Sequence, residues 1–190
     1  MNLKLFMGLL LMVLLCQCVS FPKYPTHWSP PVPEGSRIES QIVGDYHCQG
    51  INEFQTRDLL TPPDLRSFLN IEDIQKAPCA VVHFGSPEPG KLDVKIYRDN
   101  QLEAEGLLVA GRDYQVEKGR IKFKGQWIGE GDGGAAIIAK QNNSATLTQQ
   151  GDLIIKTSNI GLGVFVIVPI VGGGHNWALF KRVPCEGHGG

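Results

Sequence analysis

The sequence lacks an excess of charge of either sign, and this limits the partners it can have. Its 18 basic and 19 acidic residues give a formal net charge of −1 at pH 7. Sequence-independent binding to nucleic acid needs a basic excess that neutralises phosphates, so we expect no nucleic-acid partner. The 23 glycines and 12 prolines favour many short strands joined by turns over long helices.

Signatures of catalysis and of metal binding are also missing from the 190 residues. The chain has no GxSxG or SxxK motif, and no pair of histidines or cysteines at the spacing of zinc ligands. A thiol nucleophile, Cys48 or Cys79 acting with a histidine, is the enzymatic alternative. Cysteines of exported chains more often form disulfides than act as nucleophiles. Because the catalytic and metal-binding motifs are also missing, we expect a non-enzymatic protein without a metal or a cofactor.

Apolar runs in this sequence are too short for a membrane helix. The stretch 5–15 follows Lys4 and has eleven residues, whereas a helix needs about 20 to cross the hydrocarbon of a bilayer. A basic residue before a short apolar stretch is typical of a secretory signal peptide. We therefore predict a signal peptide over 1–20 and export of the rest of the chain.

The cysteines at the end of this signal allow two modes of processing. A signal peptidase can cut after Ser20, or Cys18 or Cys16 can become the lipidated first residue of a bacterial lipoprotein. Leu15, at position −3 from Cys18, fits a lipobox, whereas Gln17 at position −1 departs from one. We favour lipidation, which attaches the protein to the periplasmic face of the outer membrane. Without the lipid we expect a soluble periplasmic protein.

Proline dominates the segment that follows the signal. Five of the thirteen residues from 21 to 33 are prolines, which makes the segment stiff and extended. We interpret 21–37 as a linker between an anchor and a folded domain, with an arm lying across the domain as the alternative. The length of the chain then fits one domain over 38–185, followed by a flexible tail over 186–190.

From residue 41 onward, apolar side chains recur at every second position, which is typical of β-strands. Short spacers with turn residues, such as Asn142-Asn143, separate these runs, and short links join antiparallel neighbours. The predicted strands cover residues 41–47, 79–84, 91–97, 102–109, 113–117, 120–124, 135–140, 144–148, 152–156, 163–168 and 177–183.

One segment has helical periodicity instead. Thr61 can cap a helix, prolines follow it, and Leu65 and Phe68 fall on one stripe, which predicts a short helix over 61–71. We therefore predict a mainly β fold, an antiparallel meander that closes into a barrel with one short helix, and a β-sandwich is the alternative. Closure requires strand 41–47 to pair with strand 177–183, because each otherwise leaves an unpaired edge.

Several apolar and basic segments are candidates for binding. The aromatic residues of the strands can form the wall of a site for a small apolar ligand; if they fill the barrel instead, an envelope protein is the expected partner. This possible wall consists of Tyr114, Phe123, Trp127, Phe165 and Trp177. The apolar run 160–171 predicts a strand buried on both faces, with a lipid-facing strand as the alternative. The basic residues between 112 and 124 predict a solvated strand face, or contact with anionic lipid or polysaccharide.

Cysteine pairing follows from the order of the strands. Cys48 ends the first predicted strand and Cys79 begins the second, so antiparallel neighbours bring the two together. We predict a disulfide between Cys48 and Cys79, with Cys48–Cys185 as the second choice.

A set of short motifs resembles a group of uncharacterised bacterial envelope lipoproteins with lipocalin-like β domains. The motifs are the late cysteines of the signal, Tyr24-Pro-Thr-His-Trp-Ser-Pro, Val43-Gly-Asp-Tyr-His-Cys-Gln-Gly, Leu65-Arg-Ser-Phe-Leu and Trp177-Ala-Leu-Phe-Lys-Arg. The resemblance implies a lipocalin-like barrel in the cell envelope and carries no catalytic residues. We therefore expect a non-enzymatic binding or structural module of the envelope, held at the membrane by an N-terminal lipid. An inhibitor or immunity-type protein of an exported enzyme is the alternative.

Overall fold

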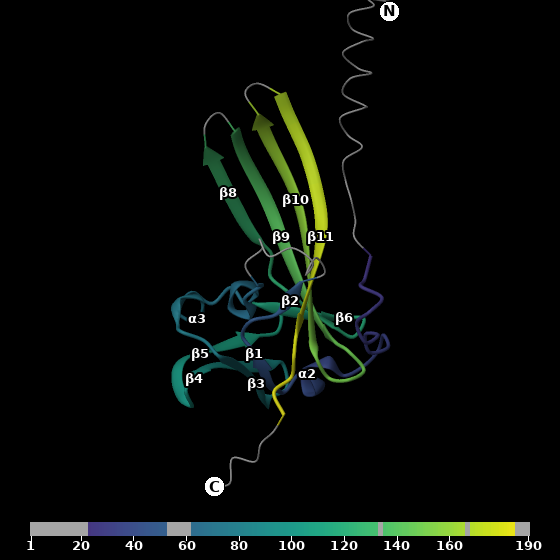
Figure 1. Cartoon of the computed structure of the whole chain (residues 1–190), viewed down its shortest axis with the longest axis vertical. Helices are drawn as coiled ribbons and strands as arrows, with labels where there is room; N and C mark the ends of the chain where they lie inside the picture. Colours follow the sequence, from purple (N-terminus) through teal and green to yellow (C-terminus); the bar gives the residue numbers. More distant parts are fainter. Residues whose placement is uncertain (1–22, 53–61, 133–134, 166–167, 185–190) are drawn as a thin grey trace, which may run out of the picture.

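A computed structural model describes residues 23–52, 62–132, 135–165 and 168–184, and strands dominate it (Figure 1). The helical elements are short, as expected for a chain rich in glycine and proline. They are α2 (Ile38–Gln41), the 3-10 helix η1 (Leu65–Phe68) and α3 (Glu72–Lys76). The prediction of a mainly β, antiparallel fold is confirmed.

The strands pair antiparallel in two sheets. Four of them form a sheet in the order β1-β3-β4-β5, and six others follow the order β2-β11-β10-β9-β7-β6, with β8 paired to β9. The strands of the first sheet are β1 (Gly44–His47), β3 (Val81–Glu88), β4 (Lys91–Arg98) and β5 (Gln101–Val109). Those of the second are β2 (Ile51–Asn52), β6 (Tyr114–Glu117), β7 (Arg120–Phe123), β8 (Gln126–Asp132), β9 (Ala135–Leu147), β10 (Leu153–Phe165) and β11 (Val168–Phe180).

Strands β9, β10 and β11 have 13 residues each and run through two parts of the molecule. Their lower halves belong to a thick body that also contains the four-stranded sheet. Their upper halves extend beyond it together with β8 (Figure 1). We call this upper part the projecting sheet, which consists of β8 and residues 135–141, 159–165 and 168–174.

Both sheets contribute to one apolar core in the body. Tyr46, Phe84 and Ile96 come from the four-stranded sheet, and Ile155 and Phe180 from the other, and all five are buried. The edge-to-face contact of Tyr46 with Phe84 has ring centroids 5.9 Å apart. Burial raises the pKa of Tyr46 to about 12, and its hydroxyl donates to the carbonyl of Ile42 at 3.0 Å.

The proline-rich segment lies along the outer face of β10 and β11. Trp28 is buried there against Ile154 and Leu179, and the Tyr24 ring meets Trp177 edge to face, with centroids 5.3 Å apart. A bridge between Pro31 and Thr148 continues this contact. The described residues from 23 to 37 therefore form an arm on the domain.

Isolated bridges connect the two sheets at both of their outer ends. Tyr46 pairs with Arg182, where the His47 N–H donates to Lys181 at 3.0 Å, so the predicted first and last strands meet at one bridge. At the other end, Ala110 bridges to Tyr114 in the turn between β5 and β6. A continuously paired closed barrel is not found among the described strands.

The strand boundaries differ from the prediction in the long hairpins. Asn142-Asn143, which we predicted to be a turn, lies inside β9, because the pairing with β10 continues unbroken through both residues. The predicted strand 163–168 spans the end of β10 and the start of β11. Strand β8 was not predicted, because Gly129 and Gly131 interrupt its alternation. The predicted helix over 61–71 is a single 3-10 turn, and α3 follows it.

Candidate functional site

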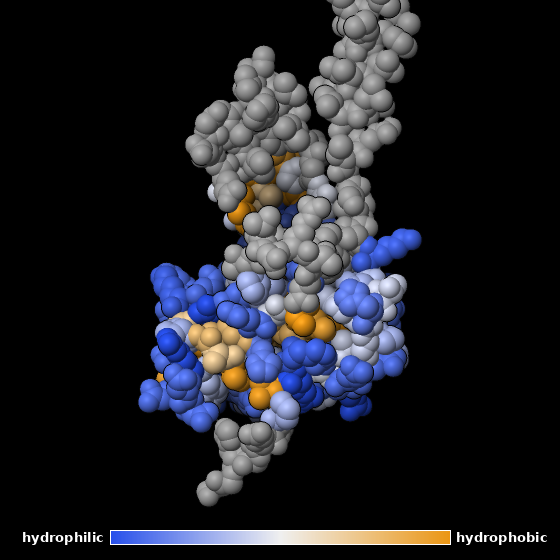
Figure 2. Space-filling model, in the orientation of Figure 1, coloured by the Kyte–Doolittle hydropathy of each residue, from blue (hydrophilic) through white to orange (hydrophobic). Residues whose placement is uncertain are grey.

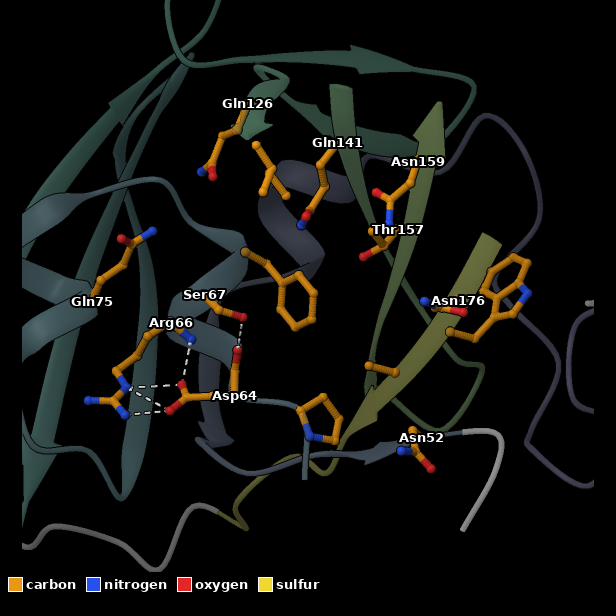
Figure 3. A pocket seen from close by; sticks show the side chains of 15 residues that line it. Asn52, Asp64, Arg66, Ser67, Gln75, Gln126, Gln141, Thr157, Asn159 and Asn176 are labelled. Atoms are coloured by element: carbon orange, nitrogen blue, oxygen red, sulfur yellow. Dashed lines mark hydrogen bonds and ion pairs between the residues drawn. The ribbon is translucent and has the colours of Figure 1, made fainter. Parts of the chain in front are cut away.

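A cavity of about 820 Å³ opens where the body meets the projecting sheet (Figure 3). Its first wall is the inner face of β8, β9, β10 and β11. Its second wall is the chain around η1, together with Gln75 of α3. Ten of its fifteen lining residues are polar or charged. The amide and hydroxyl side chains of the first wall are Gln126, Gln141, Thr157, Asn159 and Asn176.

Strand alternation explains why polar groups gather at this level. On β10, Leu153 and Ile155 face the core, so Thr157 and Asn159 must face the same way two and four residues later. The register places Asn159 beside Gln141 on the neighbouring strand. A polar layer therefore continues the inner face directly above the apolar core.

The lower part of this layer is satisfied within the protein. Asn143 accepts hydrogen bonds from the hydroxyl of Thr157 at 3.0 Å and from Nε2 of Gln141 at 3.1 Å. Its own amide nitrogen donates to the carbonyl of Phe68 at 3.4 Å. These bonds join β9 and β10 to η1 and fix the floor of the cavity.

The upper part of this polar layer contains groups without a hydrogen-bond partner. Nε2 of Gln126 and Oδ1 of Asn159 are buried and have no hydrogen-bond partner among the described residues. Both side chains line the cavity (Figure 3). A buried donor or acceptor without a partner costs about 1–3 kcal/mol, which is why such groups usually have a partner. A donor and an acceptor therefore lie without a partner in the wall of the cavity.

The charged groups on the second wall neutralise each other. The carboxylate of Asp64 accepts from the backbone N–H of Arg66 at 2.9 Å and from its guanidinium Nε at 2.9 Å. The guanidinium also donates to the carbonyl of Ala77. The hydrogen bond to Asp64 raises the pKa of Arg66, which keeps the guanidinium ionised. The wall therefore carries no net charge, and a neutral polar ligand fits it best.

Of the five residues predicted as an apolar ligand wall, the four whose side chains are described do not come together. Tyr114 and Phe123 are cross-strand partners buried in the core, and the Tyr114 hydroxyl donates to Glu39 at 2.7 Å. Trp127 is 72% exposed on the projecting sheet. Trp177 packs against Tyr24 of the arm. The side chain of Phe165 lies outside the described residues.

The residues that line the cavity were not predicted from the sequence. A signal for them was present, since polar residues occupy every second position directly before an apolar inward series on β9 and directly after one on β10. Asn143 was instead assigned to a turn. Gln126 could not be assigned to a face, because β8 was not predicted.

Both cysteines that were candidate nucleophiles are joined in a disulfide. Cys48 and Cys79 are bonded, with their Cα atoms 6.0 Å apart, so the predicted pair is confirmed. The second choice, Cys48–Cys185, is wrong for the same reason. The hypothesis of a Cys/His hydrolase is also wrong, because neither sulfur is a free thiol. Cys16, Cys18 and Cys185 lie outside the described residues.

The other side chains offer few groups for chemistry. His83 Nδ1 of β3 lies 2.8 Å from Asp45 Oδ1 of the neighbouring strand β1. Neither Cys48 nor Cys79 can serve as a nucleophile beside this pair, because the two are bonded to each other. In the part of the chain that the structure describes, no three histidine, cysteine or acidic residues gather where they could hold a metal.

A second groove, of about 700 Å³, has a basic lining and lies on the outer face of β7, β9 and β10. Lys122 and Lys156 flank Ser144 there in one cross-strand row. Burial, and then repulsion from Arg120, lowers the pKa of Lys156. Its ammonium lies 5.2 Å from the centroid of the Trp177 ring. The two faces of these strands therefore differ in character, neutral inside and basic outside.

No protein-family model, curated protein or solved structure matches this chain. None of the helices within the described ranges is long and apolar enough to span a membrane.

Proposed function

We propose that this protein is an exported, non-enzymatic binding module of the bacterial cell envelope, and that its ligand occupies the amide-lined cavity. The observation that carries the proposal is a pair of buried polar atoms without a hydrogen-bond partner, Gln126 Nε2 and Asn159 Oδ1, in two residues that line the cavity. A cavity of about 820 Å³ lies within the range of small-molecule sites.

The ligand is polar and uncharged, in contrast to the apolar ligand suggested by the sequence. Amides recognise hydroxyl and amide groups, and Arg66 is already neutralised by Asp64. Gln126 and Asn159 lie on strands separated by β9, so their backbones are about 10 Å apart. A ligand that meets both groups spans about two sugar rings. A neutral saccharide with acetamido groups, which both donate and accept, has this chemistry.

Export and anchoring complete the proposal. The signal over 1–20 directs the chain out of the cytoplasm, and a Cys48–Cys79 disulfide is compatible with an oxidising compartment. A lipid on Cys18 or Cys16 then holds the domain at the periplasmic face of the outer membrane.

The domain itself is a lipocalin-like barrel in this proposal. The bridges Tyr46–Arg182 and Ala110–Tyr114 support closure, because they link the two sheets that share one core. Apart from β2, which pairs with β11, and β8, which pairs with β9, the order becomes β1-β3-β4-β5-β6-β7-β9-β10-β11. This order follows the chain, as in a meander.

Calorimetric titration with a neutral disaccharide of N-acetylated hexoses tests the ligand. We expect Gln126→Leu and Asn159→Leu each to weaken binding at least about tenfold, because each removes one buried hydrogen bond. Both variants should unfold at the same or a higher temperature than the wild type, because each loses an unpaired buried group. Gln101→Leu, on the exposed end of β5, is the matched control and should bind normally. Variants that lose stability but bind the disaccharide normally would contradict the proposal.

Labelling with a radioactive fatty acid tests the anchor. We expect the label in the wild type and its loss in either Cys18→Ala or Cys16→Ala. Wild-type protein without label would show that the signal is cleaved and the protein is not a lipoprotein.

A further inference from the structure

The outer face of the projecting sheet is apolar and exposed. Cross-strand partners share a face, so Trp127, Lys140 and Ile160 form one row, and Ile138 and Leu162 form the next row toward the tip. Trp127 is 72% exposed, and the three aliphatic residues of these rows are 60–66% exposed. Figure 2 shows apolar residues among polar ones on the visible side of the base of this sheet. Exposed apolar patches of this kind usually mark an interaction site.

Basic side chains lie beside this apolar surface on the same face. Lys140 belongs to the Trp127 row itself, and Lys122 and Lys156 share a row four residues further down β10. Tryptophan and lysine are the residues that concentrate at the level of lipid headgroups. From the body toward the tip, the outer face therefore carries first the row of Lys122 and Lys156, then the row of Trp127 and Lys140, and then the aliphatic row of Ile138 and Leu162.

The strands beyond the Trp127 row are uncharged where they continue toward the tip. Residues 160–165 and 168–174 contain no charged residue. Ile138 and Leu162 lie two residues, or about 7 Å, beyond the row of Trp127. This depth lies within the roughly 15 Å of hydrocarbon in one leaflet.

The N-terminal arm leaves the predicted lipid within reach of the same level. Tyr24 contacts Trp177, which lies four residues, or about 13 Å, below Gly173 in the row of Trp127. Cys18 precedes Tyr24 by six residues, which reach at most about 20 Å when extended. A lipid on Cys18 can therefore enter the membrane beside the projecting sheet.

We propose that the outer face of the projecting sheet inserts into one leaflet of an anionic phospholipid membrane, with Trp127 and Lys140 at the headgroups and Ile138 and Leu162 in the acyl chains. Lys122 and Lys156 then lie on the aqueous side of the headgroups. They are close enough to be attracted by the negative charge of the lipids. The inference does not depend on the ligand of the cavity. It gives the domain a fixed orientation, with the cavity held just above the membrane surface.

Quenching of tryptophan fluorescence by brominated lipids tests this insertion. The protein is purified after export and processing in its own host. Vesicles of phosphatidylglycerol and phosphatidylethanolamine carry bromine on the acyl chains. The chain has three tryptophans, so the quenching that disappears in Trp127→Phe is assigned to Trp127. We expect strong quenching of Trp127, and the same quenching in Gln126→Leu, which separates this test from that of the cavity.

A pair of double variants measures the contribution of the apolar rows. We expect Ile160→Ser with Leu162→Ser to weaken vesicle binding about 100-fold or more and to leave the unfolding temperature unchanged. Leu102→Ser with Leu107→Ser, two exposed residues of β5 in the body, is the matched control and should bind vesicles normally.

Two results would overturn the proposal. The first is vesicle-attached protein whose Trp127 is not quenched, since the N-terminal anchor alone would then account for attachment. The second is a dimer in sedimentation experiments that dissociates in the Ile160→Ser, Leu162→Ser variant, since a second copy would then cover the face.

Discussion

Ile154 and Ile160 lie on the same face of β10, yet the first is fully buried and the second is 66% exposed. In the body, Trp28 of the arm covers the outer face of β10 and the four-stranded sheet covers its inner face. Neither cover extends over the projecting sheet within the described residues. The alternation along the strand is the same in both halves, so burial here depends on a second layer supplied by distant segments of the chain.

The comparison also separates two uses of apolar residues. A single sheet layer in water gains little stability from its apolar side chains, because no second layer packs against them. In the body these residues stabilise the fold. In the projecting sheet they gain free energy only when a partner, in our proposal a lipid leaflet, removes them from water.

Truncation of this matched pair should give the largest difference. We expect Ile154→Ala to lower the free energy of unfolding by about 4 kcal/mol, because it leaves a cavity beneath Trp28. Ile160→Ala should change it by no more than about 0.5 kcal/mol. Urea denaturation followed by circular dichroism measures both. Similar losses in the two variants would mean that the projecting sheet is covered within the folded protein.

Removal of the disulfide should affect the body and spare the projecting sheet. The Cys48–Cys79 bond closes a separation of 31 residues, which on the chain-entropy model contributes about 3–4 kcal/mol. We expect the variant Cys48→Ala with Cys79→Ala to lose this amount in urea denaturation. Its Trp127 emission in the native state should equal that of the wild type, and a shifted emission would show that the two parts are coupled.

Loss of the arm should turn the lower outer face into a surface like the upper one. Trp28 is 7% exposed and packs on Ile154 and Leu179. We expect Trp28→Ala to cost about 2–3 kcal/mol, below the usual cost of a core tryptophan, because the arm can detach instead of leaving a cavity. Limited proteolysis should cut residues 23–37 faster in this variant. Trp127→Ala, which removes an exposed tryptophan, should have neither effect.

The same contrast explains what could be predicted from the sequence. The disulfide and most strands of the body could be predicted from local signals. Alternation of apolar and polar residues marks the strands, and the positions of the strand ends bring the two cysteines together. The long hairpins did not, because Asn142-Asn143 is an ordinary turn signal, and only its pairing with Thr157 and Ser158 keeps it extended. The run 160–171 was expected to be buried on both faces. That expectation is wrong for Ile160 and Leu162, because no local signal tells whether a second layer exists.

The smallest expected effect concerns the turn between β5 and β6, where the isolated bridge between Ala110 and Tyr114 lies. The carboxylate of Asp113 accepts from the Arg112 guanidinium and from the backbone N–H of Val109, both at 2.9 Å. The Arg112 hydrogen bond, together with that of Val109, lowers the pKa of Asp113 from its ordinary 3.8.

A carboxyl whose pKa is lowered by folding binds protons more readily in the unfolded chain. Its contribution to stability is therefore fully present above about pH 4 to 5 and is lost as the pH falls through the lowered folded pKa. We expect Asp113→Asn to cost about 1 kcal/mol at pH 7, mainly through the weaker bond to Val109, and nothing near pH 2. Urea denaturation at the two pH values measures this, and Asp99→Asn, in the exposed β4–β5 turn, is the control with no expected change. An equal loss for Asp113→Asn at both pH values would show that the side chain acts through its shape and not through its charge.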